Sequence, residues 1–181
     1  MTQTQQPSLS SPRLKLRPFI ASDADAVRNL AGHPAIAAGT IGVPHPYPEG
    51  LATQWIARHP DEWGRRSAVT FAIELKSTHQ LVGSISLMRM TQDSAELGYW
   101  VGVPYWNRGY CTEAAQQLID FGFNKLGLNR IIGKHLVSNP ASGGVLVKCG
   151  FTRIVNPHME LWKNDEPVKL FHYYLQRSGS A

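Results

Sequence analysis

The chain has only two cysteines among its 181 residues, Cys111 and Cys149, and no C-x-x-C spacing. Two isolated thiols provide neither a disulfide framework nor a zinc site, so a reducing compartment is the simplest setting. No run of about 18 apolar residues is present that could cross a membrane. Residues 1–11 are rich in Gln, Ser and Thr, which is not the pattern of a signal peptide. We therefore expect a soluble, cytoplasmic protein without a membrane partner.

Charged residues are also scarce, at 17%, whereas hydrophobic residues make up 43%. This balance predicts a folded chain with a single core. The net charge of +5 and the pI of about 9.4 suit an anionic ligand. The cations are dispersed and do not alternate with aromatic residues, so nucleic acid is not expected as a partner. The seven histidines show no metal-ligand spacing, so no metal is expected.

The pattern of apolar residues predicts one domain at 13–177, with flexible tails at 1–12 and 178–181. Ser22 to Asp25 forms a capping box before a helix that ends at His33-Pro34, and a Pro- and Gly-rich loop covers 39–50. Strands are predicted at 13–17, 67–75, 81–87, 94–103, 129–137, 151–162 and 168–175, and further helices at 51–56, 110–126 and 139–149. The last two strands form a hairpin around Asn164-Asp165. A crossover through helix 110–126 makes strands 94–103 and 129–137 parallel. The fold class is α+β.

The turn before helix 110–126 is the first candidate site. The strand 94–103 ends near Pro104, and the chain then passes through Asn107-Arg108-Gly109 into the helix. The first N–H groups of a helix have no partner within it, and the helix dipole adds positive charge there. This arrangement favours an anion, most naturally a phosphate. The alternative is that Gly109 is simply a glycine at a helix start.

Three further polar residues are candidate site residues, one in an apolar strand and two at the start of a helix. Glu96 lies in an apolar strand, where burial of a carboxylate is costly unless it has a partner or a function. A salt-bridged structural acid is the alternative role for Glu96. Asn139-Pro140 is typical of a helix N-cap followed by the first helical residue. Ser142, one turn further, is explained equally well by a hydrogen bond to the backbone.

Three stretches occur in an order and spacing that resemble the GNAT acetyltransferase superfamily, and within it the RimJ/RimL type of N-acetyltransferase. They are AELGYWV at 95–101, WNRGYCTEA at 106–114, and NPAS at 139–142 running to KCGF at 148–151. LKLRP at 14–18 and GSI at 83–85 also fit, so the resemblance covers roughly 13–176. It implies the GNAT fold: a mixed, mostly antiparallel sheet of about seven strands with a splayed parallel pair, and helices on both faces.

The resemblance also implies acetyl-CoA as the co-substrate. Backbone N–H groups of the turn would hold its pyrophosphate, which assigns Arg108, Gly109, Tyr110, Cys111 and Thr112. The pantetheine arm would run along the main chain of Trp100, Val101, Gly102 and Val103 and contact Asn139 and Ser142. A main-chain N–H near Val101 would polarise the thioester carbonyl.

For catalysis the resemblance implies direct transfer of the acetyl group to a primary amine in a ternary complex. Glu96, with a pKa raised by burial, would act as general base, and Ser142 would protonate the departing thiolate. Other branches of the superfamily place a tyrosine seven residues after the Asn, where this chain has Leu146. The acceptor is a protein N-terminus or a small-molecule amine, and it should enter between loop 33–50 and hairpin 156–168.

Several alternatives stay open at this point. Cys111 stands where the superfamily has a small residue, and a helix start could lower the pKa of its thiol and make it a nucleophile or a redox-sensitive site. Gly143-Gly144 weakens its helix by about 1 kcal/mol per glycine relative to alanine, and either lets the helix pack against CoA or leaves it mobile. The chain could be a non-catalytic acyl-CoA sensor, or associate with RNA. The donor could be another short acyl-CoA, and the family often forms homodimers.

Overall fold

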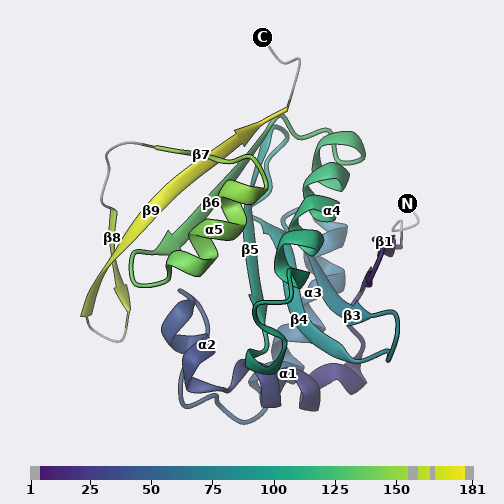
Figure 1. Cartoon of the computed structure of the whole chain (residues 1–181). Helices are drawn as coiled ribbons and strands as arrows, with labels where there is room; N and C mark the ends of the chain where they lie inside the picture. The colour runs from purple at the N-terminus through teal and green to yellow at the C-terminus, as the bar shows by residue number, and fades with distance from the viewer. Residues whose placement is uncertain (1–4, 155–158, 164–165, 178–181) are drawn as a thin grey trace.

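The computed structural model describes residues 5–154, 159–163 and 166–177 (Figure 1). Its strands are β1 (Leu9–Ser10), β2 (Leu14–Arg17), β3 (Val69–Leu75), β4 (Leu81–Met88), β5 (Ser94–Val101), β6 (Arg130–Leu136), β7 (Thr152–Arg153), β8 (Met159–Lys163) and β9 (Glu166–Gln176). Its helices are η1 (Ala21–Asp23), α1 (Ala24–Ala31), α2 (Pro34–Gly39), α3 (Leu51–Gly64), η2 (Val103–Tyr105), α4 (Tyr110–Asn124) and α5 (Pro140–Lys148). Within the described residues, none of these helices has the length and apolar character to span a membrane.

The strands form one mixed sheet in the order β1-β2-β3-β4-β5-β6-β9-β7, and β8 also pairs with β9. All neighbours are antiparallel except β5 and β6, which are parallel. Of the nine strands in the described residues, β1 and β7 have only two residues each. The predicted fold, with about seven strands and one parallel pair, is confirmed.

The parallel pair separates part of the way along its length. β5 pairs with β6 from Ser94↔Arg130 to Leu97↔Gly133. Beyond Leu97, β5 continues beside β4 as far as Val101, while β6 continues beside β9 as far as Leu136. The predicted splay is therefore present, and it begins at Gly98. It leaves one edge of each strand without its neighbour in the middle of the sheet.

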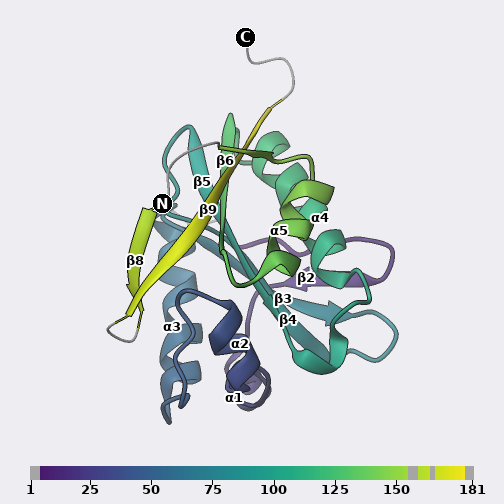
Figure 2. The same cartoon turned by 60° about the vertical axis from the view of Figure 1, so that its left-hand side comes forward.

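The two faces of the sheet carry different helices. Figures 1 and 2 show α4 and α5 on one face and α1 and α3 on the other. Alternation along β3 divides its side chains between the faces: Phe71 and Ile73 join the larger core with α4, and Ala72 joins a smaller core with α1 and α3. By the same alternation, Glu96 on β5 faces the side of α1 and α3, whereas Leu97 belongs to the larger core.

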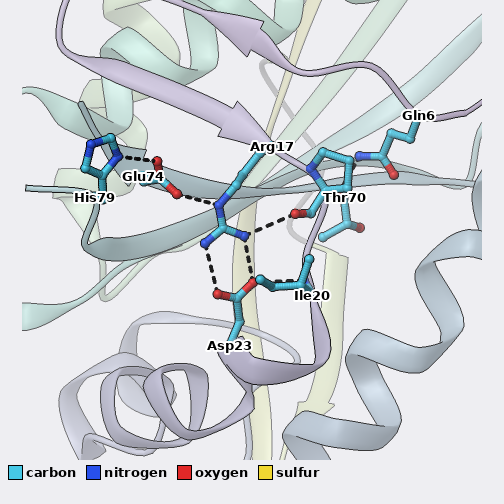
Figure 3. Close-up of polar contacts among 8 residues, drawn as sticks. Gln6, Arg17, Ile20, Asp23, Thr70, Glu74 and His79 are labelled. Atoms are coloured by element: carbon cyan, nitrogen blue, oxygen red, sulfur yellow. Dashed lines mark hydrogen bonds and ion pairs between the residues drawn. The ribbon is translucent and has the colours of Figure 1, made fainter.

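The half-buried Arg17 attaches the first helices to the sheet (Figure 3). The Arg17 guanidinium donates to both oxygens of Asp23 at 2.8 and 2.9 Å and to Glu74. Asp23 also accepts the Ile20 N–H at 2.9 Å. The predicted capping box starting at Ser22 is therefore wrong. The N-cap residue of α1 is Asp23, and its side chain accepts the Ile20 N–H of the preceding turn and no N–H of α1. Burial pushes the pKa of Glu74 up, but hydrogen bonds from Arg17 and His79 outweigh it and leave the pKa lowered.

Other boundaries also differ from the predictions. Leu9–Ser10 pairs with β2, in a segment predicted to be part of a flexible tail. His33-Pro34, predicted to end a helix, also starts α2, because the His33 ring accepts the Ala35 N–H at 3.1 Å and proline suits the first helical position. The predicted strand 94–103 ends at Val101. The hairpin of β8 and β9 is confirmed, and its turn at 164–165 lies outside the described residues.

Candidate active site

The turn before α4 has the backbone geometry of an anion cradle. Asn107 and Gly109 both have positive φ, at 60° and 77°. The Glu113 N–H, bonded to the Gly109 carbonyl at 3.0 Å, is the first helical donor. Among the described residues, no backbone acceptor is found for the N–H groups of 107–112. These donors at the start of a 15-residue helix suit a phosphate group.

The N-terminal segment supports this turn from outside. Arg13 donates to the Arg108 carbonyl at 2.9 Å and lies 4.8 Å from the centre of the Tyr110 ring. Glu113 accepts Arg13 Nε at 2.7 Å and the Ser11 hydroxyl at 2.7 Å. Burial raises the pKa of Glu113, but these hydrogen bonds outweigh it and the pKa is lowered. This support could not be predicted from local sequence patterns, because Arg13 and Glu113 are 100 residues apart.

The end of β5 presents main-chain groups to the splay. The Gly102 N–H donates to the Val82 carbonyl on β4 at 2.8 Å. Because main-chain groups alternate in direction along a strand, the N–H groups of Val101 and Tyr99 point the other way, toward β6. The Val101 carbonyl accepts the Trp106 indole N–H at 2.6 Å. Two N–H groups are thus available where a thioester carbonyl could lie.

Tyr99 and Ser142 meet across the splay. The Tyr99 hydroxyl donates to the Ser142 carbonyl at 2.8 Å, and the Ser142 hydroxyl donates to the Tyr99 oxygen at 3.1 Å. Burial raises the pKa of Tyr99, so its hydroxyl stays protonated at neutral pH. Leu146 is fully buried in the core. Tyr99 was not predicted as a site residue, because only the packing of α5 on β6, across the splay from β5, brings it to Ser142.

Asn139 is the N-cap of α5, as predicted. Its side-chain oxygen accepts the Ser142 N–H at 3.2 Å, and its amide nitrogen donates to the Gly39 carbonyl at 2.8 Å. Lys163 on β8 donates to the carbonyls of Ala37 and Thr40. The end of α2 is therefore attached to both α5 and the β8–β9 hairpin. Asn139 uses both ends of its amide within the protein, and its predicted contact with pantetheine stays a prediction.

Glu96 lies between two cations. Arg89 Nη1 and Lys134 Nζ both donate to Glu96 Oε2, at 2.6 and 2.8 Å. The Glu96 side chain is 13% exposed, compared with 19% for Lys134 and 74% for Arg89. The geometry matches the alternative of a salt-bridged acid, and its role as general base stays a prediction.

A cleft of about 710 Å³ connects Glu96 with the pair of Tyr99 and Ser142. Glu96 and Trp100 line it from the face of α1 and α3, and Tyr99 and Ser142 line it through the splay. Side chains of Tyr47 and Trp55 form part of its apolar wall. Arg108, Gly109, Tyr110, Cys111 and Thr112 form the separate cradle at the start of α4, which does not line the cleft. The predicted residues therefore fall into two groups, and β5 followed by Gly102 and Val103 connects them.

Both cysteine thiols have a raised pKa. Cys111 packs against the larger core, where burial first and the neighbouring Cys149 second raise its pKa. Burial also raises the pKa of Cys149 to about 11. Of the alternatives that the sequence leaves open for Cys111, a thiol with a lowered pKa is not supported, because burial raises this pKa.

The glycine pair in α5 has different surroundings at its two positions. A Cβ added to Gly143 would lie 2.5 Å from His135 Nε2, whereas one added to Gly144 would meet nothing within 4 Å. His135 is buried and lies 3.2 Å from the Tyr173 hydroxyl. The sequence offered close packing against CoA or mobility as reasons for the pair. The structure shows that Gly143 lets α5 pack against His135 on β6.

Known proteins share this architecture. The uncharacterized N-acetyltransferase YoaA of Bacillus subtilis (strain 168) is 26% identical over 163 residues, which are 89% of this chain and 92% of YoaA. The structure of RimL, a ribosomal L7/L12 alpha-N-protein acetyltransferase in complex with coenzyme A, superimposes with a TM-score of 0.85 at 17% identity, covering 94% of this chain and 98% of RimL. The structure of spermidine N-acetyltransferase from Vibrio cholerae, in complex with CoA and spermine, superimposes with a TM-score of 0.79 at 19% identity. The match covers 93% of this chain and 98% of that chain.

The two structural neighbours have the same fold as this chain. Residues 13–152 match the family model of the acetyltransferase (GNAT) domain. This match includes β2 to α5, and with them the cradle, the splay and Ser142. Because it covers well over half of the chain and the fold agrees, the chain belongs to the GNAT acetyltransferase family and is an acyltransferase.

Proposed function

We propose that the protein transfers the acetyl group of acetyl-CoA directly to a primary amine while both substrates are bound. The observation that supports this most strongly is the cleft that crosses the sheet where β5 and β6 separate. A sheet normally separates its two faces, but here a donor on the side of α4 and α5 can meet an acceptor on the side of α1 and α3. No covalent enzyme intermediate is then needed, which agrees with the raised pKa of the Cys111 thiol.

The donor site is supported by the cradle and the strand that precedes it. The pyrophosphate of acetyl-CoA would accept hydrogen bonds from the N–H groups of 108–112. The pantetheine arm would follow the main chain from Val103 back toward Tyr99, along the strand edge that β6 has left. The thioester carbonyl would then lie near the Val101 N–H, which stabilises the negative charge that develops on its oxygen.

The proton transfers are assigned to Glu96 and to the pair of Tyr99 and Ser142. The amine attacks the carbonyl carbon, a C–N bond forms, and the C–S bond breaks. Glu96 takes the proton from the amine at Oε1, which accepts no hydrogen bond from the described residues. The thiolate takes a proton from Ser142, Tyr99 passes its own proton to the Ser142 oxygen, and the Tyr99 phenolate recovers a proton from solvent.

The test is release of free CoA thiol from acetyl-CoA with a panel of amines, amino acids and peptide N-termini. With a working acceptor, Ser142→Ala and Tyr99→Phe should each lower kcat by about 100- to 10,000-fold, the usual contribution of a general acid or base. Glu96→Gln keeps the shape of the side chain and should lower kcat most at low pH, where less of the amine is neutral.

Two results would contradict the proposal. If all three variants turn over at the wild-type rate, the assignment of Glu96, Tyr99 and Ser142 fails. If CoA binds tightly and no acceptor in the panel releases thiol, a non-catalytic acyl-CoA sensor becomes the better description.

A further inference from the structure

We propose that the acceptor of this enzyme carries a carboxylate close to its amino group, as in a free α-amino acid. The inference rests on the proposed function and names the substrate class for the same cleft. It starts from the arrangement of Arg89, Glu96 and Lys134 on the cleft wall. Two cations share a single carboxylate oxygen there, which leaves one positive charge uncompensated among these three residues.

The wider lining has the same surplus. Its described ionic side chains are the cations Arg58, Arg89 and Lys134 and the carboxylates Glu62 and Glu96. Arg58 and Glu62 form no ion pair among the described residues, although they are four positions apart on α3. The described part of the cleft is therefore cationic overall, in a channel whose remaining wall is largely apolar.

The neighbour of Lys134 on β9 does not change this balance. His172 lies opposite Lys134 in the β6–β9 register and is 8% exposed. Burial first and the charge of Lys134 second lower the pKa of His172, and Glu96 only partly opposes them. The ring is consequently neutral at physiological pH.

The unused hydrogen-bonding capacity matches an amino acid. Lys134 has three N–H donors and Arg89 has five, and each uses one on Glu96 Oε2. The remaining N–H donors of Arg89 and Lys134 can bind an anionic group, and the planar guanidinium of Arg89 is well suited to a carboxylate. Glu96 Oε1 accepts nothing from the described residues and is available for the amine. A ligand whose amine and carboxylate are one carbon apart can use both the free donors of Arg89 and Lys134 and the acceptor Glu96 Oε1.

The geometry also separates this class from two others. A polyamine would bring several positive charges toward Arg89 and Lys134 without an anion to offset them. A peptide N-terminus has an amide in place of the carboxylate, so the cationic donors would lose their ionic partner. The aromatic wall of Tyr47, Trp55 and Trp100 gives room for an apolar side chain, so phenylalanine is a suitable first probe.

The experiment compares matched acceptors by CoA release: L-phenylalanine, its amide, the decarboxylated amine phenethylamine, and spermidine. We expect kcat/KM for phenylalanine to exceed that for phenethylamine by about tenfold or more, since the carboxylate adds charge-assisted hydrogen bonds. Arg89→Met should remove most of this preference through a higher KM for phenylalanine. Arg89→Met also removes a hydrogen bond from Glu96, so its effect on phenethylamine measures the change at the general base, and only the additional effect on phenylalanine measures loss of the carboxylate contact. Arg89→Lys, which keeps the charge, should retain part of the preference.

Arg130→Met is the matched control, because it removes the same charge from an exposed position outside the cleft. It should leave the preference unchanged. Equal or higher kcat/KM for phenethylamine or spermidine would overturn the inference, and so would an Arg89→Met variant that affects both acceptors by the same factor. Unfolding curves of each variant show whether it has kept its fold.

A second measurement separates this inference from the proposed function. Phenylalanine and phenethylamine are titrated into the CoA-bound protein by calorimetry, without any need for turnover. Binding of phenylalanine that Arg89→Met weakens by about tenfold supports the inference even if no acceptor is acetylated. Absence of phenylalanine binding overturns it, even if peptides or amines are acetylated and the proposed function stands.

Discussion

Replacement of Gly143 by alanine tests whether α5 is positioned by His135. The added Cβ would lie 2.5 Å from His135 Nε2 and 2.9 Å from Cε1. His135 cannot move away easily, because it is buried and contacts both the Leu136 carbonyl and the Tyr173 hydroxyl. Overpacking of this kind costs about 1–3 kcal/mol.

Gly144→Ala is the matched control, one residue along the same helix. Its added Cβ meets nothing within 4 Å. Both substitutions gain roughly 1 kcal/mol of helix propensity, so this contribution cancels when the two are compared. We expect Gly144→Ala to be more stable than the wild type. Gly143→Ala should be less stable than Gly144→Ala by about 1–3 kcal/mol, the overpacking cost alone.

Urea unfolding measures the difference, with equal slopes required so that the midpoints can be compared. In a thermal scan the gap corresponds to roughly 2–4 °C per kcal/mol for a chain of this size. Gly143→Ala should also lower kcat, because Ser142 is the preceding residue, whereas Gly144→Ala should not. If Gly143→Ala is as stable as Gly144→Ala, the packing of α5 on β6 described here is wrong.

Three further outcomes are expected. The lowered pKa of Glu74 contributes stability that is complete above its unfolded pKa of about 4.3 and is lost as pH falls through the folded value. Urea unfolding should therefore show Glu74→Gln less stable than the wild type at pH 7, with a gap that narrows below about pH 4; a gap independent of pH would contradict the lowered pKa. Arg13→Met should raise the Kd for acetyl-CoA several-fold by calorimetry while leaving the KM of the amine unchanged, because it supports the cradle and not the cleft. Iodoacetamide, followed by mass spectrometry, should alkylate Cys111 and Cys149 slowly at pH 7.5 and faster as pH rises, and rapid labelling of Cys111 would show a low-pKa thiol instead.

The family and the turn with unpaired N–H groups before α4 could be predicted because their signals are local. The strand, the turn with Arg108 and Gly109, and the start of α4 are consecutive in the chain. The backbone of a short segment decides where unpaired N–H groups lie. The same holds for Asn139 as N-cap, since the hydrogen bond it accepts comes from a residue three positions away.

The partners of Glu96 and Ser142 could not be predicted, because they come from other elements. Tyr99 reaches Ser142 only because α5 packs over the splay, 43 residues further along the chain. Lys134 reaches Glu96 from the far side of the same splay, 38 residues away. Alternation placed Glu96 on a face of the sheet but gave no information about which charges surround it.

By itself the sequence determined most strands and helices, the parallel crossover and the turn before α4, because periodicity, turn residues and helix starts act over a few residues. It missed the short elements β1 and α2. Only the tertiary structure decided the contents of the cleft, with two cations on one carboxylate and a tyrosine beside the serine. It also decided the burial that raises the pKa of the two thiols outside the cleft. These properties depend on distance and on loss of solvent between residues that are far apart in the chain.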